Sequence, residues 1–520
     1  MDNSPIFDRL QNSLGAILGA ADAEQTVIVV PSLTLHPDEL AKIPGVMHFE
    51  ERLLFMLSTL TQPATRVIYV TSEALDPAVV EYAFDLVPSL PRRHARQRLT
   101  LLDCADPGPT PLTEKILASP DQLDRLRRSV PARGRAHLVT YVSTPLEQSL
   151  AVALGMPLYA CDPALSEIGG KSGSRTLLRD AGVPVPAGVE GVRTEADLVA
   201  ALATVKAADR ATRSAIVKLN DSFAGGGNAV FSFEGGPNRD LEPWIRSELP
   251  RRLTVASPAD TWETYGEKLL KMGGIVERFI DSTGTVSPSV QLEITPGTGA
   301  RVVSTHDQIL GGPSGQMFLG CVFPAHPAAR RQIQALALRA GKALADRGVL
   351  GHLSIDFVVE PATAGGACHA LEINLRMGGA TAPTFLLRGL VQGEFDEATG
   401  EYRTPEGAPR CYQASDRVQN SAYRGLTPDD VLDTALRAGL LYSNARRTGV
   451  AFYMLGALAD VGKLGLVAIE TDPGRAELLY HRTIAALDGR AAPGSHPPAG
   501  PLRTTLDDTC GQLGRDHADA

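Results

Sequence analysis

The residues whose spacing best suits chemistry lie in one stretch, 351–379, with the sequence GHLSIDFVVEPATAGGACHALEINLRMGG. Two apolar-rich runs that alternate with polar residues, 352–360 and 368–377, flank a segment rich in proline and glycine, and this pattern predicts a β-hairpin. The length of the turn pairs Glu360 with Cys368. The hairpin should therefore present one polar face and one core face.

In this register Asp356 lies opposite Glu372, and Ser354 lies opposite Asn374. Side chains alternate along a strand, so Asn374 and Arg376 share a face with the two carboxylates. The intervening core residues are predicted to be Leu371, Ile373 and Leu375. Opposed carboxylates about 4.5–5.5 Å apart destabilise a sheet unless a cation lies between them. Two carboxylates and an amide suit Mg²⁺, which takes further ligands from water and phosphates. The simpler interpretation is an exposed polar strand face.

The composition is that of an ordinary globular protein of 520 residues, with a net charge of −9. This charge gives no electrostatic footprint for nucleic acid, and no basic run is long enough for a membrane surface. No run approaches about 18 uninterrupted apolar residues, and the N-terminus lacks the basic region of a signal peptide. Six scattered cysteines without a CxxC pair favour a reducing, cytoplasmic location.

The first third of the chain alternates strand-like and helix-like runs. The predicted strands are 26–33, 65–72, 98–104, 137–143 and 157–161. The predicted helices include 49–60, 77–90, 112–130 and 145–154. Such alternation indicates βαβ units and a parallel sheet covered on both faces. No GxGxxG motif follows any of these strands, so the domain is not expected to bind a dinucleotide.

A junction follows in which Gly170-Lys171-Ser172 superficially matches a P-loop. A P-loop requires GxxxxGK[ST], but Leu165 occupies the position of the first glycine, and no apolar strand precedes the segment. The P-loop interpretation is therefore rejected. Lys171 lies just before a predicted helix, 174–181, and its simpler interpretation is a surface lysine.

A second hairpin is predicted at 214–235, with three glycines at its tip: Gly225, Gly226 and Gly227. Glycine lets backbone N–H groups approach phosphates closely. Lys218, on the first strand, adds a point charge for a phosphate. By itself a glycine-rich hairpin is more often only a flexible loop.

A helical segment, 238–275, leads into a strand that passes between two subdomains and could offer backbone groups to an adenine edge. That strand contains Glu277, Arg278, Phe279 and Ile280.

The order of these features resembles the ATP-grasp fold over about residues 165–400. The resemblance implies ATP and Mg²⁺ as cofactors. The phosphate lysines would be Lys171 and Lys218, the flap Gly225, Gly226 and Gly227, and the adenine strand Glu277 to Ile280. The metal ligands would be Asp356, Glu372 and Asn374. Arg376 would lie beside the transferred phosphate, and Arg376 and Lys218 would be the catalytic residues.

The fold class expected from these features is α/β. An N-terminal parallel-sheet (pre-ATP-grasp) domain, 1–164, precedes a two-subdomain ATP-grasp fold. Its small subdomain with the glycine flap spans 165–275, and its large subdomain with the Mg-nucleotide site spans 276–400. A C-terminal α+β extension, 401–488, is expected to follow, with a lid over the acceptor site as one hypothesis for its role. The last segment, 489–520, is rich in proline and glycine and is expected to be disordered.

A narrower resemblance covers nearly the whole chain. The phrases that carry it are PSLTL (31–35), EERLLF (50–55), VIYVTS (67–72), VKLNDSFAGGGNAVF (217–231) and LEINLRMGGATAPT (371–384). They resemble the pheganomycin-type peptide ligases of natural-product biosynthesis. This likeness implies that a carboxylic acid, for example a guanidino acid, is joined to the amino group of a peptide. It matches no substrate-pocket residue individually, and a homodimer is one hypothesis for the assembly.

Such a ligase converts the carboxylate to an acyl phosphate, which the amine then attacks. Positioning and charge stabilisation dominate this chemistry. No general base for the amine stands out, because the candidates His306 and His352 are more often structural histidines. Two alternatives stay open: a ligase for another small amine or amino acid, and a nucleotide-binding sensor or scaffold without turnover.

Overall fold

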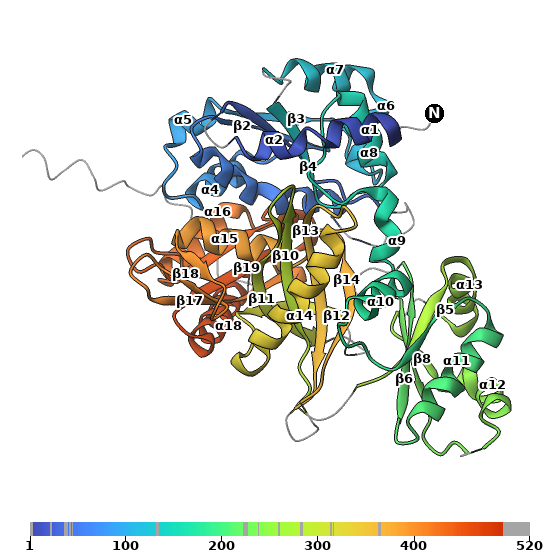
Figure 1. Cartoon of the computed structure of the whole chain (residues 1–520). Helices are drawn as coiled ribbons and strands as arrows, with labels where there is room; N and C mark the ends of the chain where they lie inside the picture. Colours follow the sequence, from blue (N-terminus) through green and yellow to red (C-terminus); the bar gives the residue numbers. More distant parts are fainter. Residues whose placement is uncertain are drawn as a thin grey trace, which may run out of the picture.

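The structure is a computed structural model, shown in Figure 1. It describes residues 4–20, 23–35, 40, 43, 45–131, 135–221, 227–237, 239–257, 260–280, 284–311, 315, 317–361 and 366–491. An N-terminal layer, blue to teal in Figure 1, lies above a large central sheet, and a small green lobe stands to one side. Most of the predicted C-terminal tail, 492–520, lies outside the described residues.

The N-terminal layer is a parallel sheet in the order β3-β2-β1-β4, as the alternating pattern predicts. Its strands are β1 (Gln25–Val30), β2 (Thr65–Thr71), β3 (Leu99–Asp103) and β4 (Ala136–Thr140). Its helices are α1 (Ser4–Gln11), α2 (Leu14–Leu18), the 3₁₀ helix η1 (Val46–Thr61), α4 (Pro77–Asp85), α5 (Arg92–Arg96), α6 (Leu112–Ala118), α7 (Pro120–Arg128) and α8 (Pro145–Leu154). The strand predicted at 157–161 makes only an isolated bridge, between Leu158 and Leu138.

Alternate residues of these strands enter two different cores, because side chains alternate across a buried parallel sheet. Val27 and Val29 pack in a core that includes residues of η1 and α4. Ile28 and Val30 pack in another core, which includes residues of α6 and α8. The sheet therefore has one helical layer on each face, and η1 lies on the face that meets the rest of the protein.

The small lobe is an antiparallel sheet in the order β5-β9-β6-β7-β8. Its strands are β5 (Gly188–Val192), β6 (Ser214–Leu219), β7 (Asn228–Ser232), β8 (Leu253–Val255) and β9 (Gly274–Arg278). Its helices are α11 (Glu195–Ala208), α12 (Leu241–Arg252) and α13 (Trp262–Met272). The short helices η3 (Pro163–Leu165), α9 (Ser166–Gly169) and α10 (Lys171–Asp180) connect the lobe to the N-terminal layer.

The large sheet follows the path β14-β13-β10-β11-β12-β17-β16-β15, and β19 pairs with both β17 and β18. Its strands are β10 (Pro288–Thr295), β11 (Gly299–Gly311), β12 (Met317–Phe323), β13 (Gly351–Val359), β14 (Cys368–Asn374), β15 (Glu394–Asp396), β16 (Glu401–Arg403), β17 (Pro409–Gln419), β18 (Gly449–Tyr453) and β19 (Lys463–Glu470). The helices around it are α14 (Pro327–Ala345), α15 (Thr381–Val391), η5 (Ser421–Tyr423), α16 (Pro428–Arg437), α17 (Ala457–Val461) and α18 (Pro473–Ala491). The C-terminal segment thus continues this sheet through the pairing of β17 with β12.

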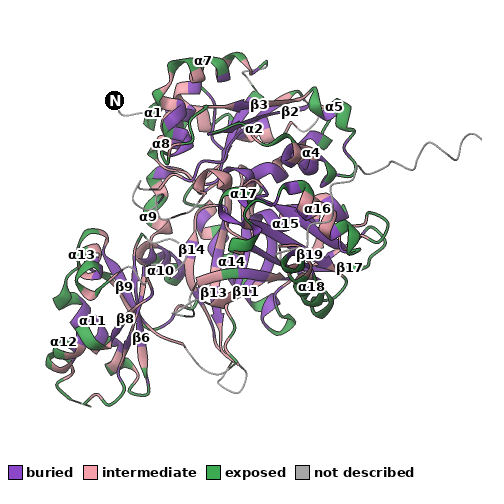
Figure 2. Cartoon of the chain, turned by 180° about the vertical axis from the view of Figure 1, so that it is seen from behind, coloured by how far each residue is buried: buried purple, intermediate pink, exposed green. Residues whose placement is uncertain are grey.

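Burial follows this layering. In Figure 2 the strands of the central sheet are mostly buried, whereas exposed residues gather on helices such as α7, α11, α12 and α13. None of the helices in the described part of the chain is both long and apolar enough to cross a membrane. The small lobe, the large sheet and η1 leave a cleft between them, and the site described next lies there.

Candidate functional site

The polar hairpin forms as predicted in its central part, where Asp356 pairs with Glu372 and Ser354 pairs with Asn374. The predicted pairing of Glu360 with Cys368 is wrong, because a bulge between Asp356 and Phe357 shifts the register.

Because of the bulge, the residues that enter the core differ from those predicted. The extra residue on β14 is Leu371, which is only half-buried and lines the cleft instead of entering the core. A bulge places two residues of one strand against one of its partner and re-aims the local side chains. Ile373 is buried as expected, and Leu375 packs against the same core while partly exposed.

The predicted metal-binding residues lie in mutual hydrogen-bond contact. The Asn374 amide donates from Nδ2 to Asp356 Oδ2 (3.1 Å) and to Glu372 Oε1 (3.3 Å). Gln308, on β11, donates to Asp356 Oδ1 at 2.9 Å, and Arg376 donates to Asn374 Oδ1 at 3.3 Å. Gln308 was missed by sequence reasoning because it lies on a separate strand, with no motif to single it out.

Both predicted phosphate lysines are buried and paired with carboxylates. Lys171 Nζ lies 2.5 Å from Glu372 Oε2, and Lys218 Nζ lies 2.9 Å from Glu277 Oε2. Arg175, on α10, binds the other oxygen of Glu277 at 2.5 Å. The side chain of Glu277 therefore holds two cations.

Lys171 is the first residue of α10, which begins three residues earlier than the predicted helix. Its position is fixed by the preceding turn, because Ser172 donates from both its backbone N–H and its hydroxyl to Asn220 Oδ1. No strand leads into this turn among the described residues, in agreement with the rejected P-loop interpretation.

The two opposed carboxylates differ strongly in proton affinity. Burial raises the pKa of Asp356, and the negative charge of Glu372 raises it further. Burial acts in the same direction on Glu372, but the ammonium groups of Lys171 and Lys218 outweigh it and lower the pKa of Glu372. Burial by itself would lower the pKa of Lys218, yet Glu277 and Glu372 raise it. The two lysines therefore keep Glu372 ionised, whereas Asp356 binds a proton more tightly than an ordinary aspartate.

The predicted adenine strand forms as β9, and its last residues line the cleft. The backbone N–H groups of Arg278 and Phe279 donate to Ala187 and Ser214, so both are already engaged. The Arg278 side chain forms an ion pair with Glu360 at 3.0 Å. Phe279 and Ile280 give this part of the cleft an apolar wall.

The glycine tip is described only in part. Gly225 and Gly226 lie outside the described residues. Gly227 is buried, and its carbonyl accepts hydrogen bonds from Leu219 N and from the Tyr265 hydroxyl, both at 3.0 Å. The flap role of these glycines therefore stays a prediction.

The cleft has a volume of about 720 Å³ and extends well beyond the hairpin. We call the part around Asp356 the hairpin end. The far end is lined by Phe49 and Arg52 of η1, by Tyr141, by Asp416 and Arg417 of β17, and by Lys463 of β19. The lining also includes Gln291, Phe318 and the segment 378–380. Sequence reasoning identified none of the far-end residues.

The far end is built around an ion pair. Arg52 Nη2 lies 2.6 Å from Asp416 Oδ2, and Arg52 Nη1 donates to the Tyr141 hydroxyl at 3.3 Å. The guanidinium of Arg52 lies 4.3 Å from the centre of the Phe49 ring, and Lys463 Nζ lies 4.5 Å from it. The Phe49 ring thus contacts two cations.

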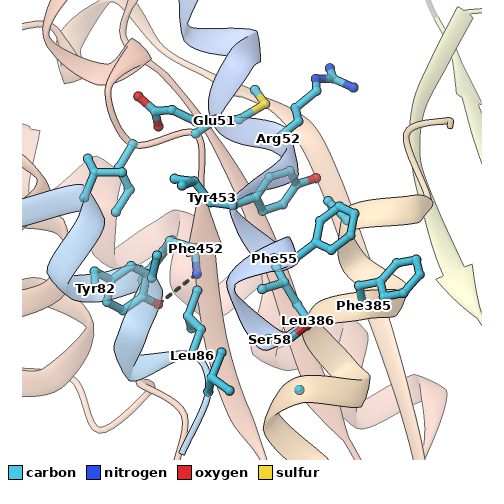
Figure 3. A pocket seen from close by; sticks show the side chains of 18 residues that line it. Glu51, Arg52, Phe55, Ser58, Tyr82, Leu86, Phe385, Leu386, Phe452 and Tyr453 are labelled. Carbon is cyan, nitrogen blue, oxygen red and sulfur yellow. Dashed lines mark hydrogen bonds between the residues drawn. The ribbon is translucent and has the colours of Figure 1, made fainter. Parts of the chain in front are cut away.

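A smaller apolar cavity lies behind this end, among η1, α4, α15 and β18. Figure 3 shows the Tyr82 hydroxyl accepting a hydrogen bond from Phe452 N (3.0 Å), while Glu51 and Arg52 direct their charged groups away from the cavity. Its volume is about 30 Å³. A water needs roughly 10–15 Å³ by this measure, so the cavity has no room for a substrate.

Neither histidine considered as a general base lines the cleft. His306 is fully buried and bonds the Tyr412 hydroxyl at 2.6 Å, and burial lowers its pKa to about 3. His352 lies 3.4 Å from Glu293 and packs edge-on against Phe385, and burial lowers its pKa as well. Both are structural in this fold.

Three family models match the sequence in separate regions. The family described as "Pre ATP-grasp domain" matches residues 68–156, "IQCH-like, ATP-grasp" matches 250–398, and "PGM1 C-terminal domain" matches 430–483. The first of these matches falls on the N-terminal sheet, the second runs from the end of α12 in the small lobe into the large sheet, and the third falls on the C-terminal segment.

Two curated proteins are similar over most of the chain. L-propargylglycine–L-glutamate ligase of Streptantibioticus cattleyicolor is 32% identical over 475 residues, which cover 90% of this chain and 94% of the ligase. IQ motif-containing protein H of Danio rerio is 24% identical over 432 residues, which cover 74% of this chain but only 40% of that protein.

Solved structures share the fold at low identity. Biotin carboxylase of Campylobacter jejuni has a TM-score of 0.54 at 13% identity, covering 91% of this chain and 97% of its own. N5-carboxyaminoimidazole synthetase of Staphylococcus aureus has a TM-score of 0.51 at 10% identity, covering 89% and 97%.

Proposed function

Because the chain belongs to the ATP-grasp ligases, we propose that it joins the carboxyl group of one small molecule to the amino group of another, with hydrolysis of ATP to ADP and phosphate. Its similarity to a ligase named for two amino acids supports amino-acid partners for both groups. A cytoplasmic location, where ATP and Mg²⁺ are available, fits this activity.

The residues of the hairpin end fit Mg²⁺ and the phosphates of ATP. Among the described residues no three His, Cys, Asp or Glu side chains gather closely enough to hold a metal by themselves. Asp356 and Glu372 supply two carboxylates, and Mg²⁺ in nucleotide sites completes its octahedron with phosphate and water oxygens. Asn374 presents Nδ2 to the carboxylates in this structure, so it becomes a ligand only after its amide rotates to present Oδ1.

The buried ion pairs keep the phosphate-binding side chains in place. Lys171 and Lys218 are held by Glu372 and Glu277 at the edge of the cleft, where both lysines can bind phosphate oxygens. Arg376 lies one hydrogen bond beyond Asn374, beside the position proposed for the transferred phosphoryl group. Fixed positive charge at this position stabilises the charge that develops during phosphoryl transfer.

ATP supplies the phosphoryl group that turns an unreactive carboxylate into an acyl phosphate with a good leaving group. The protein's task is then to bring the amine to this acyl group and to keep water away from it. The single observation that carries the proposal is the continuous cleft. It joins the hairpin end to a second polar end, which the nucleotide does not need and which is therefore available to a second substrate.

Which carboxylic acid and which amine the protein joins is a separate hypothesis. A guanidino acid and a peptide amine are candidates from the narrower sequence resemblance. The excess of cations at the far end favours an anionic group there, so a guanidino group would have to bind elsewhere. A homodimer is carried as a hypothesis only, and light scattering from the purified protein decides it.

The test is mass spectrometry of the purified protein with Mg²⁺-ATP, a panel of amino acids, guanidino acids and short peptides, and hydroxylamine. Hydroxamate together with ADP and phosphate is the expected result, and a mass-shifted amide identifies the partners. AMP and pyrophosphate would instead mean adenylation and would overturn the phosphoryl-transfer mechanism. Failure of the protein to bind ATP would overturn the proposed function altogether.

A further inference from the structure

The cleft wall next to Arg376 is a short stretch of backbone, residues 377–380, which we call the connecting segment. It leads from the polar hairpin to the first turn of α15, and Gly378, Gly379 and Ala380 line the cleft. The carbonyl of Met377 accepts a hydrogen bond from the Arg376 guanidinium at 3.2 Å. The position of the connecting segment therefore bears directly on the position of Arg376.

Gln291, on β10, holds the end of the connecting segment that meets α15. The residue lies in the cleft wall but is only 6% exposed, and both polar atoms of its side chain bind the protein. Its Nε2 donates to the Ala380 carbonyl at 3.1 Å, and its Oε1 accepts from the Thr381 hydroxyl at 2.8 Å. A carbonyl oxygen only accepts hydrogen bonds, so Ala380 fixes the orientation of the Gln291 amide. Gln291 thus serves the protein's own backbone.

Thr381 transmits this contact to the middle of the connecting segment. Its hydroxyl accepts a hydrogen bond from Gly378 N–H at 2.9 Å, and its own N–H donates to the Gly378 carbonyl at 3.1 Å. On the side of the hairpin, the Met377 N–H donates to the carbonyl of Tyr141, directly after β4, at 3.2 Å. The segment is therefore anchored by the large sheet at one end and by the N-terminal layer at the other.

Two consecutive glycines make these anchors necessary. A Cβ at Gly379 would lie 2.6 Å from the Phe318 ring, whereas a Cβ at Gly378 would meet nothing within 4 Å. Glycine is conformationally permissive and has no side chain that packing could hold. The place of this backbone in the cleft wall therefore depends on its hydrogen bonds.

We propose that Gln291 and Thr381 are positioning residues, which hold the connecting segment and, through Met377, the guanidinium of Arg376 in the geometry that phosphoryl transfer requires. This inference rests on the proposed function, because phosphoryl transfer is what gives Arg376 its task. Catalysis of this kind depends on placement, and a displacement of about 1 Å can lower the rate about 10²-fold.

The first experiment measures amide hydrogen exchange by mass spectrometry, on the full chain with Mg²⁺ and a non-hydrolysable ATP analogue. Gln291→Met removes the amide at a similar side-chain volume, and Thr381→Val removes the hydroxyl. Both should speed exchange in peptides that contain 377–381 about tenfold, as the loss of a buried hydrogen bond predicts. Thr381→Ser keeps the hydroxyl and should retain the wild-type rate.

The second experiment measures the kinetics of hydroxamate formation, with Mg²⁺-ATP, hydroxylamine and the panel of amino acids, guanidino acids and short peptides described above. Gln291→Met and Thr381→Val should lower kcat about 10- to 100-fold. The KM for ATP should stay near its wild-type value, because the ion pairs of Lys171 and Lys218 are untouched. Thr381→Ser should restore kcat.

Tyr412→Phe is the matched control. Tyr412 is fully buried in the same polar network, where its hydroxyl lies 3.0 Å from Thr384 Oγ1 and 2.6 Å from His306 Nε2. Thr384 in turn accepts a hydrogen bond from Gln291 Nε2 at 3.0 Å. The control should lower the thermal midpoint about as much as Gln291→Met, but exchange at 377–381 and kcat should stay at the wild-type level.

Three results would overturn the proposal: wild-type exchange at 377–381 in both Gln291→Met and Thr381→Val, faster exchange with an unchanged kcat, or an equal loss of kcat in Tyr412→Phe. If Gln291→Met does not fold, the pair Thr381→Val and Thr381→Ser gives the same decision. A wild-type protein that turns over no ATP would refute the proposed function, whereas the exchange measurement decides the anchoring without any turnover.

Discussion

The two ends of the cleft differ in how their charges are satisfied. At the hairpin end, Lys171 and Lys218 each bind a carboxylate of the protein at 2.5 and 2.9 Å. At the far end, Arg417 and Lys463 face the cavity without a carboxylate of their own, and one oxygen of Asp416 has no partner among the described residues. The lysines of the first end are thus paired with carboxylates of the protein, whereas two cations and one carboxylate oxygen of the second end have no such partner among the described residues.

If the hairpin end binds the nucleotide as proposed, this difference separates two tasks. A site that serves every reaction cycle with the same nucleotide can keep its cations paired until phosphates replace the carboxylates. A site that must choose a substrate gains discrimination from groups that only the right ligand satisfies, because unpaired buried polar groups penalise the wrong one.

Glu277→Gln should have the largest effect, on stability. Glu277 is 1% exposed and binds both Lys218 and Arg175, so the variant leaves two buried cations without their carboxylate. Loss of one partner of a buried ion pair typically costs about 3–5 kcal/mol. The midpoint of urea unfolding should fall accordingly. Glu248→Gln, at an exposed-arginine pair on α12, is the control and should lower the midpoint far less, because exposed ion pairs contribute little to stability. Equal midpoints for the two variants would contradict the paired state of the hairpin end.

Asp356→Asn should abolish most of the catalysis while leaving the far end intact. Loss of a group that stabilises the transition state typically lowers kcat by about 10²–10³, or about 2.7–4 kcal/mol. The measurement is ADP release with Mg²⁺-ATP, together with calorimetric titration of the amino-acid substrate. Asp433→Asn, at an exposed ion pair on α16, is the matched control. Wild-type ADP release from Asp356→Asn would mean that the metal site is misplaced.

Gly465→Ala should disturb the far end through its packing. A Cβ at Gly465 would lie 2.4 Å from the Tyr453 ring, which stands beside it across β18 and β19. Overpacking of this kind typically costs about 1–3 kcal/mol. We expect a lower thermal midpoint and weaker binding of the amino-acid substrate, with the affinity for ATP unchanged. Gly474→Ala, where the added Cβ meets only ordinary contacts, should change neither. A weakened affinity for ATP in Gly465→Ala would show that the two ends are not independent.

The smallest effect is a pH dependence at the far end. Burial lowers the pKa of Lys463 to about 8, against the influence of Asp416 and together with that of Arg52 and Arg417. The ammonium group is charged below this pKa, so a carboxylate ligand should bind well below pH 8 and lose up to about tenfold in affinity per pH unit above it. Lys463→Arg should flatten this decline, because arginine stays charged. Titration calorimetry from pH 6.5 to 9.5 measures it, and identical profiles for wild type and Lys463→Arg would contradict the assignment.

The hairpin end could be predicted because its residues are close in the sequence. Asp356 and Glu372 face each other across one short turn, and strand alternation then fixes the face of Asn374 and Arg376. The bulge at Asp356 could not be foreseen, and it moved Leu371 out of the core. Gln308 was missed because it reaches Asp356 from a strand whose neighbour in the sheet is not evident from sequence.

The far end was unpredictable for a related reason. Arg52 and Asp416 are 364 residues apart, and no local pattern links them. The parallel sheet of the N-terminal layer follows from a repeated βα pattern. In contrast, the order of the C-terminal strands, with β17 between β12 and β19, depends on long-range antiparallel pairing that short irregular segments do not encode.

The lining of the far end includes an irregularity in β17. The pairing of β17 with β19 shifts register between Ser415 and Val418, and Asp416 and Arg417 lie inside this irregularity. Residues inside it hold no place in the regular ladder of β17 and β19, so side-chain contacts such as the ion pair of Asp416 with Arg52 hold this part of the cleft lining in position. The hairpin of β13 and β14 lies at one end of the sheet path, and β10, β11 and β12 separate it from β17.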